Sequence, residues 1–225
     1  MGGEDDSSSK LEAFDPQAGA WAELAPMTTR RSNPAAAAVD GRLFAIGGYG
    51  GNFLSTVEAF DPQTGVWAAL APMPTARRGA RAAVLDGKIY VVGGYNATTR
   101  LATVEVYDPA TNAWSQAPPM GTARSGPGVA ALGGKLYAAG GHNGPQLSSV
   151  EVFDPQTNAW TALTPMSTAR QVFAMAAVQG KLYAAGSYDG TTPMATAEAF
   201  DPQQNRWEAV APMAQARRSC AVAAL

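Results

Sequence analysis

The sequence predicts an all-β protein in which a four-stranded antiparallel unit recurs about five times along 225 residues. Three landmarks share one spacing of 46 or 47 residues: a tryptophan, an Asp-Pro pair and a Pro-Met pair. The tryptophans are Trp21, Trp67, Trp114, Trp160 and Trp207. The Asp-Pro pairs begin at Asp15, Asp61, Asp108, Asp154 and Asp201, and the Pro-Met pairs end at Met27, Met73, Met120, Met166 and Met213. Since no segment has a sustained helical period, the repeat indicates a β architecture.

One repeat contains four short strand-like runs, at residues 79–85, 88–94, 103–108 and 112–117. Asp86-Gly87 between the first two is typical of a two-residue hairpin, whose turn needs positive φ at both positions. Asp-Pro and polar residues join the third and fourth runs, because proline ends the ladder and the polar residues turn the chain. Each repeat is therefore predicted to be an antiparallel meander. One such sheet cannot bury both faces alone, so we expect the copies to stack radially as the blades of a β-propeller.

The first run of each repeat is rich in small residues, as in NPAAAAV and GPGVAAL, which suits strands that converge near a propeller axis. Residues 10–225 hold 19 of the 20 strands of five blades, since they start near a third strand and end with a first strand, SCAVAAL. The second strand of that blade is missing. We expect about five blades with one incomplete, after a polar segment at residues 1–9. A fragment of a six-bladed propeller stays open as the alternative.

The motifs PMSTAR, GKLYAAGG and SVEVFDPQTNAW, which recur with small changes through residues 11–225, resemble the Kelch repeat. The resemblance implies a Kelch-type β-propeller, whose usual role is to bind other proteins. It also implies where a partner peptide binds, by likeness to the BTB-Kelch adaptors of cullin-RING ubiquitin ligases. Contacts are expected from the residue directly after each repeat arginine and from the residue after each Gly-Gly pair.

Residues that are the same in every repeat are expected to serve the blade rather than a partner. The tryptophans offer large areas for packing, about 150–250 Å² each. Ten charges are also fixed, and because buried charges need partners we expect the arginines to pair with the glutamates. The arginines are Arg31, Arg77, Arg124, Arg170 and Arg217, and the glutamates are Glu12, Glu58, Glu105, Glu151 and Glu198.

Residues that change from repeat to repeat gather at one end of the predicted propeller. In a meander, the loops between strands two and three lie at the same end as the links from strand four to the next blade. Tyrosine, arginine and small polar residues there form a plausible interface. The predicted partner-binding set is Ser32, Asn33, Tyr49, Arg78, Tyr95, Asn96, Ser125, His142, Asn143, Gln171, Tyr188, Asp189 and Arg218.

Four arginines at this end do not repeat, namely Arg30, Arg78, Arg100 and Arg218, and they favour a protein partner with an acidic peptide segment. The alternative is that they are ordinary solvated loop charges. The function predicted on this basis is substrate recognition in a cullin-RING ubiquitin-ligase adaptor, with an actin-binding or signalling scaffold as the alternative.

Composition argues against several other functions. A net charge of −2 and a pI near 5.4 give no overall attraction to nucleic acid or to anionic lipid. No apolar run approaches the length of a membrane span, and the acidic N-terminus is unlike a signal peptide, so a cytoplasmic location is expected. The single Cys220 cannot form an internal disulfide. Nothing in the sequence indicates the oligomeric state.

An enzyme is not expected. His142 is the only histidine, so a multi-histidine metal site is out of reach, and Cys220 is predicted to lie more than a blade away from it. The double glycines are not followed by a helix that could hold a phosphate, and we expect no cofactor and no metal. A channel enzyme such as a Kelch-type sugar epimerase remains the alternative. It requires an unpaired carboxylate on the propeller axis.

Overall fold

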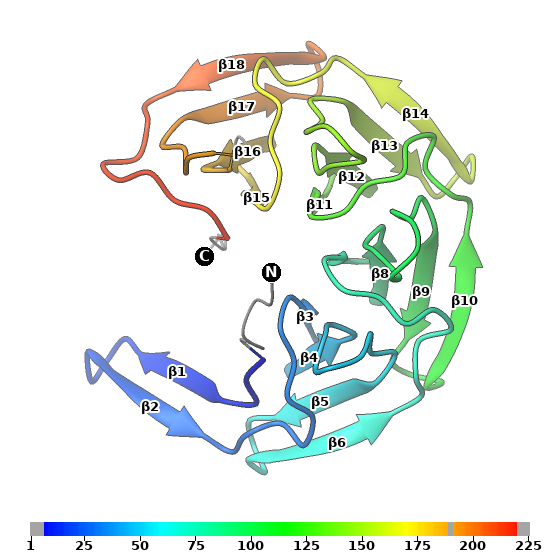
Figure 1. Cartoon of the computed structure of the whole chain (residues 1–225), viewed down its shortest axis with the longest axis vertical. Helices are drawn as coiled ribbons and strands as arrows, with labels where there is room; N and C mark the ends of the chain where they lie inside the picture. The colour runs from blue at the N-terminus through cyan, green and yellow to red at the C-terminus, as the bar shows by residue number, and fades with distance from the viewer. Residues whose placement is uncertain (1–6, 189–190, 220–225) are drawn as a thin grey trace.

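The structure is a computed structural model that describes residues 7–188 and 191–219. Five-residue strands form one two-stranded sheet and four four-stranded sheets (Figure 1). The two-stranded sheet is β1 (Leu11–Asp15) and β2 (Ala20–Leu24). The first four-stranded sheet is β3 (Ala35–Val39), β4 (Arg42–Ile46), β5 (Val57–Asp61) and β6 (Val66–Leu70), and the second is β7 (Arg81–Leu85), β8 (Lys88–Val92), β9 (Val104–Asp108) and β10 (Ala113–Ala117). The third is β11 (Gly128–Leu132), β12 (Lys135–Ala139), β13 (Val150–Asp154) and β14 (Ala159–Leu163). The fourth is β15 (Ala174–Val178), β16 (Lys181–Ala185), β17 (Ala197–Asp201) and β18 (Arg206–Val210).

The predicted meanders are confirmed. In every four-stranded sheet the order in space is the order in sequence, and all neighbouring strands are antiparallel. The hairpin prediction holds as well, because Asp86 and Gly87 have φ values of 50° and 72°. Asp40-Gly41 and Gln179-Gly180 turn the chain in the same left-handed conformation. These turns specify the pairing of strands one and two.

The sheets are arranged radially, with strands such as β3, β11 and β15 toward the centre (Figure 1). Strand β7 lies beside β3 on one side and β11 on the other, and β11 also lies beside β15. Small residues permit this approach: a Cβ placed on Gly128 would lie 2.7 Å from the ring of Phe173, which directly precedes β15 of the next sheet. The prediction that the first strands converge is therefore confirmed.

The core lies between the blades. An aromatic residue of one second strand packs on the third-strand aromatic of the next sheet, as in Phe44 and Tyr107, whose ring centroids are 6.0 Å apart. The strand-four tryptophan also links neighbouring sheets, because Trp114 Nε1 donates to the Ala71 carbonyl at 2.9 Å. Trp67, Trp160 and Trp207 donate in the same way to Ala25, Pro118 and Thr164. The recurring aromatic residues thus join blades to one another.

The predicted ion pairs are present in four of the five repeats. Each arginine in the link that enters a sheet reaches the glutamate on the third strand of that sheet. The closest N–O distances are 2.5 Å for Arg31–Glu58, 2.8 Å for Arg77–Glu105, 2.6 Å for Arg124–Glu151 and 2.9 Å for Arg170–Glu198. All eight side chains are at most 7% exposed.

The β1–β2 sheet departs from the prediction. Phe14 and Trp21 are 49% and 70% exposed, whereas the Phe14 equivalents Phe60 and Phe200 are at most 4% exposed. The prediction that Trp21 is buried was therefore wrong: it contacts Phe14, but within the described part of the chain β1 pairs only with β2 and no other strand covers that face. The fifth charge pair is also not formed there. Glu12 and Arg217 are both exposed.

Two segments predicted from the sequence, at the N-terminus and the C-terminus, lie only partly within the described residues. The run 219–225, predicted as the nineteenth strand, lies outside them except for Ser219, as does Cys220. Part of the predicted N-terminal segment is described. Ser8 exchanges two backbone hydrogen bonds with Arg31, and Met27 donates to Ser9, which matches the bonds that Met73 and Arg77 make in the next repeat. The number of blades stays a prediction.

Candidate partner-binding rim

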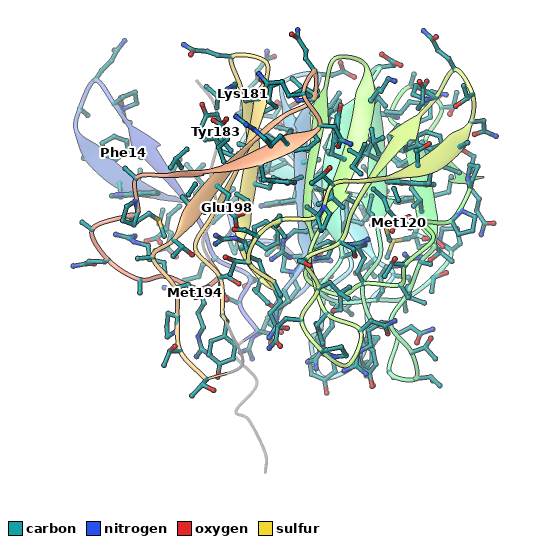
Figure 2. All side chains as sticks on the ribbon, turned by 90° about the horizontal axis from the view of Figure 1, so that it is seen from above. Phe14, Met120, Lys181, Tyr183, Met194 and Glu198 are labelled. Carbon is teal, nitrogen blue, oxygen red and sulfur yellow. The ribbon has the colours of Figure 1, made fainter. Side chains whose placement is uncertain are left out.

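The two ends of the strands carry different loops. Hairpin turns such as the one before Lys181 lie at one end, and the long loops that hold Met194 lie at the other, with Glu198 between them (Figure 2). We call the second end the rim. It consists of the residues after the fixed arginines, the residues after the double glycines, and the loops that follow them.

The rim residues are paired by the backbone. Arg78 and Tyr95 exchange two N–H to O=C bonds of 3.0 and 2.9 Å, and Ser125 and His142 do the same at 3.0 and 2.9 Å. The pairs Ser32–Tyr49 and Gln171–Tyr188 form equivalent bridges. The structure therefore brings together the two sets of positions that the sequence analysis grouped, although their role in binding stays a prediction.

Buried ion pairs hold these loops in place. Arg31 donates from Nη1 to the Gly47 carbonyl at 2.7 Å and from Nη2 to Glu58. The other fixed arginines with a glutamate partner make the same bond to Gly93, Gly140 and Gly186. The double glycine is required by close approach: Gly47 has φ 61°, and a Cβ there would lie 2.7 Å from the Arg77 carbonyl oxygen. A side chain at this position would push the link out of place.

Burial and hydrogen bonding act in opposite directions on the charges beneath the rim. Burial lowers the pKa of Arg77 and Arg124, and their glutamate partners counteract part of this effect. Burial alone raises the pKa of Glu58, but hydrogen bonds from Thr28 and Arg31 outweigh it and hold that pKa below its ordinary value. Glu198 behaves in the same way through Ser167 and Arg170. Hydrogen bonding thus favours the ionised form of Glu58 and Glu198 beneath the rim.

The second position after each fixed arginine has a backbone role that the sequence analysis missed. Asn33, Gly79, Gly126, Val172 and Ser219 all have φ between 48° and 64°. Each N–H of the last four donates to the carbonyl of the preceding member, at 2.8 to 3.0 Å. This chain of bonds runs from blade to blade around the axis. These positions therefore have a structural role through the backbone whatever their side chain, and the role of Asn33 in binding stays a prediction. Glycine at two of the positions was the available signal in the sequence.

Aromatic rings fix the orientation of the variable arginines. The guanidinium carbon of Arg78 lies 5.3 Å from the ring centre of Tyr49 and 5.6 Å from that of Phe53. Arg100 stacks over Tyr95 at 5.2 Å. Arg218 similarly covers Tyr188 at 4.9 Å. Stacking orders an arginine while its edge N–H groups stay available to a ligand.

A cationic cavity of about 270 Å³ opens between the second and third four-stranded sheets. Its lining includes Arg78, Arg81, Arg100 and His142, and no carboxylate among the described lining residues. His142 Nδ1 lies 3.1 Å from the Ser125 carbonyl and so carries the proton, which leaves Nε2 to accept from Arg100 at 3.4 Å. Nε of Arg100 is buried and has no hydrogen-bond partner. The cavity is therefore suited to an anionic group.

Not every predicted binding residue is available. Ser125 is only 7% exposed, and a Cβ on Gly79 of the neighbouring blade would lie 2.9 Å from its hydroxyl. Asn96 uses its side-chain oxygen to accept from the backbone of Thr98 and Thr99. Asn33, Asn143 and Arg218 are exposed, the remaining described members are partly exposed, and Asp189 lies outside the described residues. Phe53 and Arg81 were not in the predicted set; Arg81 is the one charge in an otherwise small first strand, which could have revealed it.

A second cavity of about 380 Å³ lies on the axis, where residues from β3, β7, β11 and β15 meet. Arg81 is the only ionisable side chain among its described lining residues. Within residues 7–188 and 191–219 there is no group of three or more His, Cys, Asp or Glu side chains that could hold a metal ion. No helix in that part of the chain is long and apolar enough to cross a membrane.

Comparison with known proteins agrees with this architecture. The family model described as the KLHDC2/KLHL20/DRC7 Kelch-repeats domain matches residues 1–186, and the model of the Kelch motif matches residues 171–214. A solved structure described as that of YjhT has a TM-score of 0.85 and 20% sequence identity, and the match covers 95% of this chain and 81% of that one. At this identity the likeness shows the fold alone. Together with the ladder of blades and their buried arginine–glutamate pairs, these matches establish that the chain belongs to the Kelch-repeat family and has a β-propeller fold.

Proposed function

We propose that this Kelch propeller is a protein-interaction module whose rim binds an acidic segment of a partner protein. The observation that carries the proposal is the cavity lined by Arg78, Arg81 and Arg100 with no carboxylate among its described lining residues. A carboxylate of the partner placed there would form charge-assisted hydrogen bonds with groups that already face the cavity.

The order of these side chains supports binding rather than mere solvation. An exposed arginine loses rotamer freedom when it binds, which costs about 0.5–1.5 kcal/mol per side chain. Arg78 and Arg100 are held on aromatic rings before any partner arrives, so part of this cost is already met. Tyr49 and Phe53 beside them add the aromatic surface that is common in protein interfaces.

We also propose that the module is not an enzyme. A propeller enzyme of the epimerase type would need an acid or base on the axis, and the described lining of the axial cavity offers arginine alone as an ionisable group. Recognition at the rim needs no such group.

The test compares peptides that differ only in charge. Labelled peptides rich in Glu and Asp, and the same peptides with Gln and Asn instead, are titrated with the protein by fluorescence polarisation. We expect the acidic set to bind and the amide set to bind at least about tenfold more weakly, with affinity falling as salt rises.

The variant Arg78→Ala/Arg100→Ala should lose at least about tenfold in affinity. Its matched control is Lys88→Ala/Lys135→Ala, which removes two cations at the opposite end of the strands and should bind normally. Equal losses in both variants would mean that net charge, and not the rim, determines binding.

The finer role that we propose is substrate recognition for a cullin-RING ubiquitin ligase. It is supported by the resemblance to adaptors and by the same rim. A partner that binds the native protein should then fall in abundance when the native protein, but not Arg78→Ala/Arg100→Ala, is expressed. Binding without any change in abundance would instead favour a scaffold role.

A further inference from the structure

We propose that the cavity between the second and third four-stranded sheets binds a phosphoserine or phosphothreonine side chain of the partner segment. Phosphorylation of the partner then controls its binding to the rim. This inference rests on the function proposed above, that the rim binds an acidic segment, and it names the group that fills the cavity.

The first argument is that three arginines of one blade meet at this cavity. The backbone of Tyr95 bridges to Arg78 on one side and to Arg100 on the other. The same ladder recurs in the other four-stranded sheets without a cation in either outer position, as Ser32–Tyr49–Phe53, Ser125–His142–Gln146 and Gln171–Tyr188–Pro193. Positions equivalent to Arg81, the first residue of β7, hold Ala35, Gly128 and Ala174. These three charges therefore belong to this cavity and not to the repeat.

The second argument is the balance of charge. The described lining residues hold three guanidinium groups and no carboxylate, and Glu105 and Glu151 beneath the rim are paired with the buried Arg77 and Arg124. A carboxylate of a partner brings a single negative charge. A phosphate monoester brings a charge of about −1.5 to −2 at pH 7 and three strong acceptor oxygens. Phosphate therefore matches the three cations better than a carboxylate does.

The third argument is that two of these arginines are already held in place. Arg78 lies over the ring of Tyr49. Arg100 lies over the ring of Tyr95 and donates from Nη2 to Nε2 of His142 at 3.4 Å. Nε of Arg100 is buried without a hydrogen-bond partner, so an oxygen acceptor there would satisfy it. Because arginine presents its N–H groups as a rigid planar fork, both side chains suit the bidentate bonds that phosphate oxygens accept.

The size of the cavity indicates one side chain of a larger partner. Pockets that hold a whole small molecule have volumes of about 300–1,000 Å³. This cavity measures about 270 Å³ and lies on the rim. Tyr95, the only phenol ring of its described lining, is already engaged by Arg100 and by Phe53. A short phosphorylated side chain is therefore favoured over phosphotyrosine, whose ring would need an apolar surface of its own.

The experiment extends the peptide titration by one residue. The Glu- and Asp-rich peptides carry phosphoserine, Glu or Gln at one central position and are titrated with the native protein by fluorescence polarisation. We expect the phosphoserine peptides to bind at least about tenfold more tightly than the Glu peptides. This comparison needs no protein variant, so it does not depend on whether a variant folds.

Protein variants locate the phosphate. Arg78→Lys and Arg100→Lys keep the charge but lose the planar fork, so each should reduce the preference for phosphoserine over Glu severalfold. Arg81→Ala introduces the residue found at positions 35 and 174, so the fold should tolerate it while phosphopeptide affinity falls. The thermal midpoint of each free variant checks folding.

Arg42→Lys is the matched control. Arg42 also lies over an aromatic ring, with its guanidinium carbon 5.4 Å from the ring centre of Phe44. It begins β4 directly after the Asp40-Gly41 turn, at the opposite end of the strands from the rim. Its replacement should therefore leave the preference for phosphoserine unchanged.

Four results would overturn the proposal, and they separate it from the function on which it rests. Equal affinity for the phosphoserine and Glu peptides would remove phosphate recognition and leave the acidic-segment function intact. Failure of every acidic peptide to bind would remove both. Inorganic phosphate that displaces the labelled peptide as effectively as unlabelled phosphopeptide would reduce the cavity to a small-anion site. Binding to phosphoinositide vesicles but not to phosphopeptides, lost in Arg78→Ala/Arg100→Ala, would assign the cavity to a membrane surface.

Discussion

The guanidinium of Arg124 lies 2.6 Å from the carboxylate of Glu151, and the two side chains are 0% and 7% exposed. Arg124 also donates to the carbonyls of Gly140 and Ser149, and Glu151 accepts the backbone N–H of Gly121 at 2.6 Å. One ion pair therefore joins the link, the double-glycine loop and the third strand. Its repetition in four blades makes it the main polar support of the rim.

Removal of one partner should be costly. Glu151→Ala leaves Arg124 charged and buried, so we expect a loss of about 3–5 kcal/mol in the free energy of unfolding. Denaturant titration measures it. The double variant Arg124→Leu/Glu151→Leu should recover part of the loss, because no uncompensated charge remains. Lys135→Ala, which breaks an exposed pair, should change stability much less. Additive losses in the double variant would contradict the coupling.

Acid should destabilise the propeller through Glu58 and Glu198, whose pKa values are held below the ordinary value. A carboxyl with a lowered folded-state pKa contributes stability that is present above its unfolded-state pKa, about 4.3, and lost as pH falls through the folded-state value. The denaturation midpoint should thus be flat from pH 7 to about 5 and fall below that. Glu58→Gln should be less stable at pH 7 and lose less on acidification. An unchanged pH slope in Glu58→Gln would assign the effect to other groups.

Features encoded in a few adjacent residues were predictable from the sequence. Asp86-Gly87 specifies its own turn, because the backbone conformation depends on those two residues alone. The arginine–glutamate pairs were also predictable, since a charge that recurs in every repeat is most simply explained by a partner that also recurs. The strand order and these pairs both involve residues far apart in the sequence. They were predictable because the repeat shows which distant positions are equivalent.

Features that depend on one copy or on the backbone were not predictable. Phe53 and Arg81 occur in single repeats, and the predicted binding set included neither, because repeat comparison does not show which variable side chains line the same cavity or stack on the same arginine. The hydrogen bond from Val172 to Gly126 involves main-chain atoms, and the only sign of it in the sequence is glycine at two of the five equivalent positions. The exposure of Trp21 depends on which strands lie beside β1, and Trp21 has the same local sequence context as its half-buried equivalents.

Two equivalent tryptophans, Trp160 and Trp21, offer a matched test of how strongly the neighbouring strands determine the contribution of this residue to stability. Trp160→Ala should cost about 3 kcal/mol, because Trp160 packs on Phe153 and donates to the Pro118 carbonyl. Trp21→Ala should cost less than about 0.5 kcal/mol, since Trp21 is 70% exposed. Urea titrations of the two variants measure both values. A large loss for Trp21→Ala would mean that the β1–β2 sheet is covered in solution.

The approach of the inner strands should make Gly128 intolerant of larger residues. A Cβ there would lie 2.7 Å from the Phe173 ring and 2.8 Å from the Met175 Cβ. Both neighbours are buried, and Met175 meets the added atom through its own Cβ, which moves only with the β15 backbone. Gly128→Val should therefore separate β11 from β15 and cost about 1–3 kcal/mol or more.

Ala36→Val on β3 is the control for Gly128→Val, because Ala36 is exposed. It adds apolar volume to a first strand without crowding a buried neighbour and should change stability by less than about 0.5 kcal/mol. Chemical denaturation of both variants measures the two changes in the free energy of unfolding. If Gly128→Val were as stable as the native chain, the first strands could move apart freely, and the axial chain of backbone bonds through Gly126 and Val172 would not constrain the blades.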